Sequence, residues 1–166
     1  GHGDAVGGVI ASNSANITKA RRKLQRFGQC SSPFNSWLIL RGLRTLPMRL
    51  RQHSVNALAL AEFLNEHPKI EWVRYLGLAN HPQAEWAQTY LPNGSGGVLV
   101  FKVPGGFNEM CQMMNLLQLC QIGTSLGDVY TLASPQESHD NTVRISVGCE
   151  DTKDIIDDFS QALSQL

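Results

Sequence analysis

The sequence predicts an α+β architecture: a mainly antiparallel sheet with helices on one face, preceded by a long helical spine. Two observations carry this prediction. Two long helical segments follow one another before Pro68, and short strand-like stretches then alternate with amphipathic helical ones. The chain has 166 residues, of which 42% are apolar and 17% charged. This is enough for one globular domain, or for a small domain with part of a larger one.

The first segment, residues 6–11, is apolar and predicts a short buried strand. A helix should follow the polar run 12–14 and continue to about Arg26, because Gly28 is a typical helix stop. This helix is rich in lysine and arginine. Such a run could bind phosphate, but a neutral chain without interleaved aromatic residues favours a solvated helix face.

The spine begins at Ser32-Pro33, which combines a capping hydroxyl with a proline that needs no N–H partner. The helix from Pro33 to about Leu46 is apolar on most sides, so we expect it to be largely buried. Pro47 should then kink or restart the helix. The next helix should end before Pro68, with one apolar stripe formed by Leu46, Leu50, Ala57, Ala61 and Leu64.

After Pro68 the pattern changes to short alternating elements. In chain order we expect a strand at 70–76, a short helix at 82–91, a strand at 97–103, a methionine-rich helix around 110–117 and a strand at 121–126. A methionine stripe of this kind is typical of core packing. Together with the interleaved order, these elements predict helices covering one side of a sheet.

The last third should contain a loop to Asn141, a half-buried strand and a final helix. Val143, Ile145 and Val147 alternate with polar residues, which is the pattern of a strand with one buried face. Asp151 can cap the last helix. Its inner face should be formed by Ile155, Phe159, Ala162, Leu163 and Leu166.

Composition argues against several classes of function. The formal net charge is zero, which argues against binding of nucleic acid or of an anionic membrane surface. No apolar run approaches the roughly 20 residues that cross a bilayer. The four cysteines form no CxxC pair and the histidines no HxxxH pair, so we expect reduced thiols, no zinc site and a cytoplasmic protein.

Arg144 is the sharpest candidate for a functional residue. It lies within a predicted strand, on the face opposite Val143 and Ile145. A guanidinium there must reach solvent or find an anion, and its geometry suits a carboxylate. Two interpretations are open: a ligand carboxylate, or a structural ion pair with Glu150 or Asp151. The run Ser125-Leu126-Gly127-Asp128 is a second polar cluster, at a predicted strand end.

Several motifs occur in one order along the chain. They are Gly1-His2-Gly3-Asp4 with Gly7-Gly8, Ser32-Pro33-Phe34-Asn35, residues 40–46 (LRGLRTL), Asn56-Ala57, Gly77-Leu78, His81-Pro82, Gly97-Val98-Leu99, Ser125-Leu126-Gly127, and residues 143–148 (VRISVG) with Glu150-Asp151. The series resembles the Cys/Met-metabolism family of pyridoxal-phosphate enzymes over essentially the whole chain. That family includes cystathionine γ-synthase, cystathionine lyases, methionine γ-lyase and O-acetylhomoserine sulfhydrylase.

The resemblance implies a type I pyridoxal-phosphate fold, with residues 1–46 as the end of the large cofactor-binding domain and the start of the spine. Residues 47–166 would be the small C-terminal domain. It also implies pyridoxal 5'-phosphate as cofactor, an amino-acid substrate, and assembly as a homodimer or homotetramer. The family arginine that grips the substrate α-carboxylate matches Arg144, and the serine beside that carboxylate matches Ser125.

The resemblance places the Schiff-base lysine a few residues upstream of Gly1, so this chain would hold no catalytic lysine and the isolated chain would be inactive. The parent enzyme would perform γ-replacement or γ-elimination on sulfur amino acids or O-acyl-homoserines. The alternative is a non-catalytic fragment or oligomerisation module. The sequence departs from the family in residues 133–141, which form a shorter segment, and in Asp128, where many members have glycine.

Overall fold

The computed structural model describes residues 1–137 and 140–166. Ser138 and His139, which belong to the shortened segment 133–141, lie outside the described residues. The chain divides into two compact units: residues 2–46, here called the N-terminal unit, and residues 47–166 together with Gly1, called the C-terminal unit. Within the described residues, no helix is both long enough and apolar enough to span a membrane.

In the N-terminal unit, helix α1 (Ser14–Phe27) begins and ends as predicted. The Asn13 side chain accepts a hydrogen bond from the Asn16 amide at 3.0 Å. Gly28 closes the helix in the left-handed conformation, with φ of 67°, which glycine adopts without the penalty of a Cβ. The helix has no buried residue, so its basic side chains lie on a solvated surface.

Helix α2 (Pro33–Leu43) starts at the predicted cap, where the Ser32 hydroxyl accepts from the Asn35 amide at 3.1 Å. It ends at Leu43, three residues before the expected Leu46. The expectation that it is largely buried is wrong for this chain, because none of its residues is buried and Trp37 is 55% exposed. An apolar helix can be buried only against another apolar surface, and the described residues do not supply one here.

Residues 6–11 do not form the predicted strand. They have no regular secondary structure, and Val9 is 92% exposed. A strand requires a neighbour that accepts and donates its main-chain hydrogen bonds. The described strands all pair with one another between residues 72 and 146, so residues 6–11 have no such neighbour.

The C-terminal unit is built on helix α3 (Leu46–Glu66), which restarts the chain with Pro47 in its first turn. Ala57, Leu60, Ala61 and Leu64 are fully buried, but Leu50, which the predicted stripe included, is 44% exposed. His53 and Asn56 are also buried on this helix. The buried face of α3 therefore lies around the second half of the predicted stripe and contains two polar residues.

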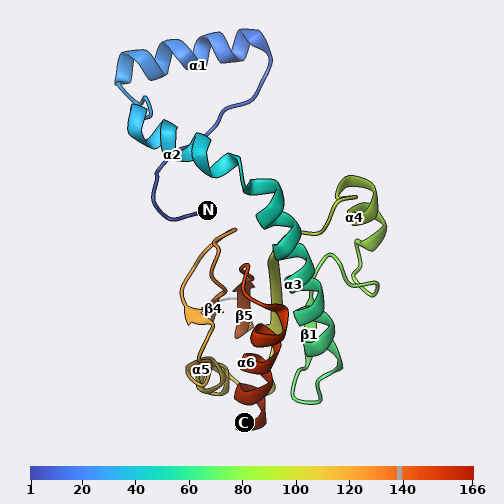
Figure 1. The fold of residues 1–166 in the computed structure, drawn as a ribbon. Helices are drawn as coiled ribbons and strands as arrows, with labels where there is room; N and C mark the ends of the chain where they lie inside the picture. Colours follow the sequence, from blue (N-terminus) through green and yellow to red (C-terminus); the bar gives the residue numbers. More distant parts are fainter. Residues whose placement is uncertain (138–139) are drawn as a thin grey trace. The chain divides into compact units, whose positions relative to one another are not determined.

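Five strands form one sheet in the order β1-β2-β5-β4-β3 (Figure 1). They are β1 (Trp72–Arg74), β2 (Val98–Lys102), β3 (Gln121–Ile122), β4 (Leu132–Gln136) and β5 (Thr142–Ser146). Every pair is antiparallel except β3–β4, which is parallel. The predicted mainly antiparallel sheet is confirmed.

Strand β4 corrects the prediction of an unbroken loop up to Asn141. Its sequence, Leu-Ala-Ser-Pro-Gln, has no alternation of apolar and polar residues and contains a proline, so it carries no local strand signal. It is extended because it pairs with β5 along its whole length, from Leu132↔Ser146 to Gln136↔Thr142.

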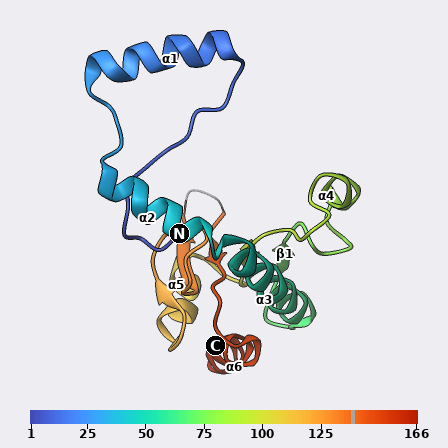
Figure 2. The ribbon, with the colours of Figure 1, turned by 45° about the horizontal axis from the view of Figure 1, so that its top comes forward.

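The other helices are α4 (Ala84–Tyr90), α5 (Phe107–Asn115) and α6 (Thr152–Ser164). Figures 1 and 2 show α3 and α6 on one side of the sheet. One core joins them with α5 and the strands: it includes Leu60 and Leu64 of α3, Met110, Met113 and Met114 of α5, Ile155, Phe159, Ala162 and Leu163 of α6, and Leu99, Phe101, Val143 and Ile145 of the sheet. Leu166, predicted to be on the inner face, is 41% exposed because it follows the end of α6.

Asp158 is a buried residue of α6 whose carboxylate binds the main chain of the segment between α5 and β3. Its two oxygens accept the amides of Gln118, Leu119 and Cys120 at 2.7, 3.0 and 2.9 Å. Asp158→Asn replaces one acceptor by a donor facing these amides, so we expect a loss of about 1–2 kcal/mol in the free energy of unfolding, measured with urea. The neighbouring Asp157→Asn is the control, because Asp157 forms an exposed ion pair with Lys153 and its substitution should change stability by less than about 0.5 kcal/mol. Equal effects of the two substitutions would contradict this account.

Candidate carboxylate-binding site

Strand β5 directs alternate side chains to opposite faces of the sheet. Val143 and Ile145 are fully buried in the core beneath the helices. Arg144 therefore lies on the other face, as predicted, and it is half-buried. In the sheet register it stands between Val100 of β2 and Ser134 of β4.

Arg144 forms no ion pair with Glu150 or Asp151, the partners of the structural interpretation, in the described part of the chain. The Glu150 carboxylate instead accepts from the Thr131 amide at 2.5 Å and from the Thr131 hydroxyl at 2.8 Å. The Asp151 carboxylate accepts from the Lys153 amide at 2.8 Å, as a helix cap. Because both carboxylates are engaged elsewhere, neither neutralises the guanidinium in the described part of the chain, and the structural interpretation loses its two expected partners.

Ser125 lies two positions beyond the last main-chain hydrogen bond between the β3 and β4 segments, in which the Gly123 amide donates to the Ala133 carbonyl at 2.8 Å. Its neighbour Thr124 forms a hydroxyl–hydroxyl hydrogen bond with Ser134 at 3.2 Å. Ser134 is in turn the cross-strand neighbour of Arg144. Strand β4 thus lies between the segment that leads to Ser125 and the strand that carries Arg144, although these two residues are 19 positions apart in sequence.

The face of the sheet around Arg144 is rich in hydroxyl groups. Ser134 and Ser146 are buried, and both lie in the register that shares a face with Arg144. The Ser146 hydroxyl has no hydrogen-bond partner among the described residues. A guanidinium on a sheet face that also carries hydroxyl groups is suited to a carboxylate, whose two oxygens accept several hydrogen bonds.

Comparison with known proteins shows the family of this chain. The model of the Cys/Met metabolism PLP-dependent enzymes matches residues 1–164. The chain belongs to this family. Its relatives include cystathionine gamma-lyase of Dictyostelium discoideum, which is 37% identical over 99% of this chain and 47% of its own length. O-succinylhomoserine sulfhydrylase of Pseudomonas aeruginosa is 37% identical over 100% of this chain and 45% of its own length.

L-methionine gamma-lyase of Fusobacterium nucleatum is a third relative, 35% identical over 100% of this chain and 46% of its own length. The chain spans about half the length of the curated relatives it matches. The alignment with the Dictyostelium protein runs over 182 positions, more than the 166 residues of the chain. That relative therefore has segments that this Cys/Met-metabolism chain lacks.

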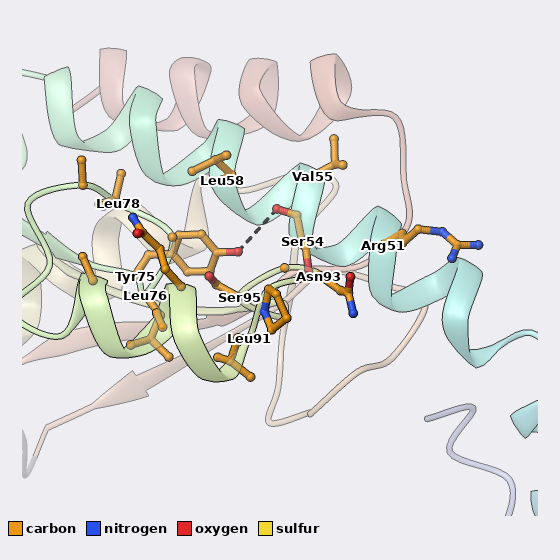
Figure 3. Close-up of a pocket in the computed structure, with 17 residues that line it drawn as sticks. Arg51, Ser54, Val55, Leu58, Tyr75, Leu76, Leu78, Leu91, Asn93 and Ser95 are labelled. Atoms are coloured by element: carbon orange, nitrogen blue, oxygen red, sulfur yellow. Dashed lines mark hydrogen bonds between the residues drawn. The ribbon is translucent and has the colours of Figure 1, made fainter.

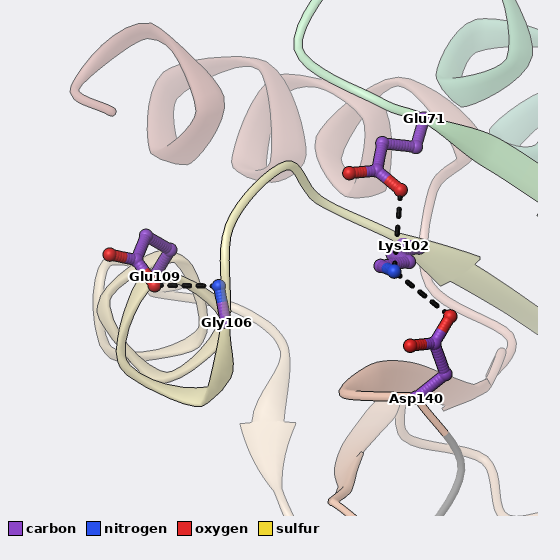
Figure 4. Close-up of polar contacts among 5 residues, drawn as sticks. All are labelled: Glu71, Lys102, Gly106, Glu109 and Asp140. Carbon is purple, nitrogen blue, oxygen red and sulfur yellow. Dashed lines mark hydrogen bonds and ion pairs between the residues drawn. The ribbon is translucent and has the colours of Figure 1, made fainter.

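The family cofactor, pyridoxal phosphate, is held by a lysine, and the five lysines of this chain do not fit that role. A lysine that attacks a carbonyl needs a neutral amine and hence a lowered pKa. Lys102 lies between Asp140 at 2.9 Å and Glu71 at 3.4 Å (Figure 4), and the hydrogen bond to Asp140 raises its pKa. The pKa of Lys153 is likewise raised by its hydrogen bond to Asp157.

The remaining lysines are also engaged or solvated. The Lys69 ammonium donates to the Leu163 and Ser164 carbonyls at the end of α6. Lys19 and Lys23 lie on the solvated helix α1. None of the five lysines is therefore suited to hold the cofactor in the arrangement that the structure describes.

A separate cleft of about 700 Å³ lies between α3, α4 and the loops at 75–79 and 91–95 (Figure 3). Two of its polar side chains are hydrogen-bonded within the protein: the Tyr75 hydroxyl donates to the Gly96 carbonyl at 2.8 Å, and the Ser54 hydroxyl accepts from the Gly96 amide at 3.1 Å. Burial raises the pKa of Tyr75 to about 12, so its phenol stays protonated at neutral pH. Neither Arg144 nor Ser125 lines this cleft.

His53 is a buried polar residue of α3. It is 1% exposed on α3, and neither ring nitrogen has a hydrogen-bond partner among the described residues. His53 packs closely against Gly97: a Cβ added at Gly97 would lie 3.0 Å from the His53 Cβ and 3.0 Å from the Val147 carbonyl oxygen. Burial, followed by the positive charge of Arg49, lowers the pKa of His53 below 6.5, while the negative charge of Glu150 acts in the opposite direction.

We expect His53 to make the protein less stable as the pH falls. Its pKa is lower in the folded than in the unfolded state, so the unfolded state binds more protons between the folded pKa and 6.5. The stabilisation is complete above pH 6.5 and is lost as the pH falls toward the folded pKa. Urea denaturation at pH 7.5, 6.5 and 5.5 measures this loss, which His53→Leu should reduce. The control His81→Gln changes a loop histidine and should keep the pH dependence; an unchanged dependence in His53→Leu would contradict the assignment.

Proposed function

We propose that the whole protein is a pyridoxal-phosphate-dependent enzyme that performs γ-replacement or γ-elimination on sulfur amino acids or O-acyl-homoserines. This chain would contribute the part of the active site that binds the substrate carboxylate. The observation that carries the proposal is the half-buried Arg144, which lies among hydroxyl groups while Glu150 and Asp151 are bound elsewhere. The names of the three relatives support this reaction class.

Arg144 would bind the α-carboxylate through two parallel hydrogen bonds, and Ser125 would support the same group. Holding the carboxylate fixes the orientation of the Cα bonds, which is a positioning contribution to rate. When bound, pyridoxal phosphate supplies an electron sink for negative charge at carbon. The lysine that holds the cofactor would come from the rest of the whole protein, since the five lysines here do not fit.

We further propose that the C-terminal unit is the small domain of a type I pyridoxal-phosphate fold and that the N-terminal unit is the end of its large domain. The exposed apolar side chains of residues 6–11 and of α2 support this assignment, because such surfaces mark contact with other protein. The rest of the protein or a second subunit of a homodimer or homotetramer would cover them. A cytoplasmic location stays a prediction.

The same apolar surface argues against the alternative of an autonomous non-catalytic module. Size-exclusion chromatography with light scattering on the 166-residue chain separates the two. A well-behaved monomer would favour the autonomous module, and aggregation without a defined stoichiometry would favour a part of a larger enzyme.

The function is tested by assaying the whole protein with pyridoxal phosphate on three substrates: L-methionine, L-cystathionine, and O-succinylhomoserine with sulfide. Release of a 2-oxo acid, or formation of homocysteine, is the expected result. The 166-residue chain alone should be inactive and should not develop the yellow absorbance of a lysine adduct. Absence of turnover on every substrate by the whole protein, or a stable adduct of the chain at Lys19 or Lys102, would contradict the proposal.

A further inference from the structure

The loop that carries Ser125 is fixed at its far end by Glu150. The Glu150 carboxylate accepts both the amide and the hydroxyl of Thr131, the residue that leads into β4. The Thr131 hydroxyl also accepts the Gly148 amide at 2.9 Å, and the Cys149 amide donates to the Val129 carbonyl at 2.8 Å. Four hydrogen bonds thus join residues 148–150 to residues 129–131.

Residues 148–150 are themselves fixed to helix α3 by Asn56, which is fully buried. Its amide nitrogen donates to the Gly148 and Glu150 carbonyls at 3.1 and 2.9 Å. Its amide oxygen accepts from the Thr152 hydroxyl at 2.6 Å and from Gln52 at 2.8 Å. Every hydrogen-bonding group of this buried amide side chain is used, which makes the arrangement rigid and specific.

The two segments are also in direct steric contact at Gly148. A Cβ at this position would collide with the Glu150 carboxylate, the Val129 carbonyl and the Tyr130 main chain. Most of these are main-chain atoms, which cannot move aside as a side chain can. The turn after β5 and the end of the Ser125 loop therefore pack with no room for displacement.

We propose that Glu150, held by Asn56, is the positioning residue of the carboxylate-binding site. Strand β5, which carries Arg144, runs directly into residues 148–150. Glu150 ties that end of β5 to the end of the loop that begins with Ser125. It thereby fixes where the loop stands relative to the arginine, without touching the substrate itself. This inference rests on the proposed function of Arg144 and Ser125.

The test uses the whole protein with its cofactor and two ligands. L-norleucine has the shape of methionine without its sulfur leaving group, and n-pentylamine is the same chain without the carboxylate. The dissociation constant of n-pentylamine divided by that of L-norleucine, both measured by titration calorimetry, reports recognition of the carboxylate alone. A merely structural residue would change both constants together, so the ratio separates the two roles.

Glu150→Ala should lower this ratio about tenfold, the effect of misplacing one hydrogen bond to a charged group. Glu150→Gln should restore most of it, because the amide oxygen still accepts the Thr131 N–H and the Thr131 hydroxyl can accept from the new amide nitrogen. Thr131→Val, which removes only the hydroxyl, should give an intermediate ratio. If Glu150→Ala does not fold, as judged by circular dichroism, the other two variants decide.

Glu109→Ala is the matched control. Glu109 also accepts a main-chain amide, from Gly106 at 2.8 Å, but it does so at the start of α5 (Figure 4). Its removal should leave the ratio unchanged. Loss of affinity for both ligands in proportion, or an unchanged ratio in the folded Glu150 and Thr131 variants, would overturn the inference. If the wild-type protein does not prefer norleucine, or Arg144→Ala does not alter the preference, the proposed function fails instead.

Discussion

Replacing Arg144 by alanine in the whole protein is expected to weaken the binding of L-norleucine by about 2–3 kcal/mol, or roughly 30- to 150-fold. The lost interaction is a charge-assisted pair with the carboxylate, made on a half-buried sheet face where solvent screens it only in part. The binding of n-pentylamine should change little, since this ligand has no carboxylate. Titration calorimetry with the two ligands measures the difference directly.

Two further variants sharpen this prediction. Arg144→Lys should recover only part of the affinity, because an ammonium cannot form the two parallel hydrogen bonds of a guanidinium. Arg74→Ala is the matched control: Arg74 belongs to β1 on the same face of the sheet, but its guanidinium lies 5.6 Å from the centre of the Trp72 ring. An equal loss in the Arg74 and Arg144 variants would show that general positive charge, rather than Arg144, attracts the carboxylate.

Phe159→Ala is expected to give the largest loss of stability, about 3–5 kcal/mol in the free energy of unfolding. The ring of Phe159 is fully buried between α6 and the sheet and meets the ring of Phe101 edge-to-face, with centroids 6.1 Å apart. Truncation removes this contact and leaves a cavity in a core that helices and strands share. Urea denaturation measures the change.

The control for this prediction is Phe107→Ala, at the exposed start of α5. Phe107 is 40% exposed, so its truncation removes less buried surface and should cost about 1 kcal/mol or less. Similar losses for the two phenylalanines would argue against a single core centred on α6 and β2. A large loss for Phe159 alone also bears on function, because β2 is the neighbour of the strand that carries Arg144.

The choice among reactions is expected to lie partly in the short segment between Ser125 and Arg144. The Dictyostelium relative aligns over more positions than this chain has residues, so it has segments that are missing here. We propose residues 133–141 as one place where this chain is shorter. In the structure β4 occupies the first part of that segment and pairs with β5. A shorter connection beside the strand of Arg144 would alter the space next to the proposed carboxylate site, where the side chain of the proposed substrate would lie.

Features that depend on neighbours a few positions away could be predicted from the amino-acid pattern. The cap at Ser32, the stop at Gly28 and the cap at Asp151 each act through hydrogen bonds or dihedral angles within one helical turn. The alternation in β5 placed Arg144 on the face opposite the core, because side chains of a strand alternate whatever their partners are. The ordered motifs also indicated the family, which the match over residues 1–164 confirms.

Features that depend on partners far apart in the chain became clear only from the folded structure. Strand β4 exists because β5 pairs with it, and the apolar residues 6–11 form no strand because no described strand pairs with them. Glu150 was an open candidate to neutralise Arg144 until its bonds to Thr131 were seen. Pairing and burial are set by residues far apart in the chain, so local pattern identifies the groups available for an interaction, while the fold decides which of them meet.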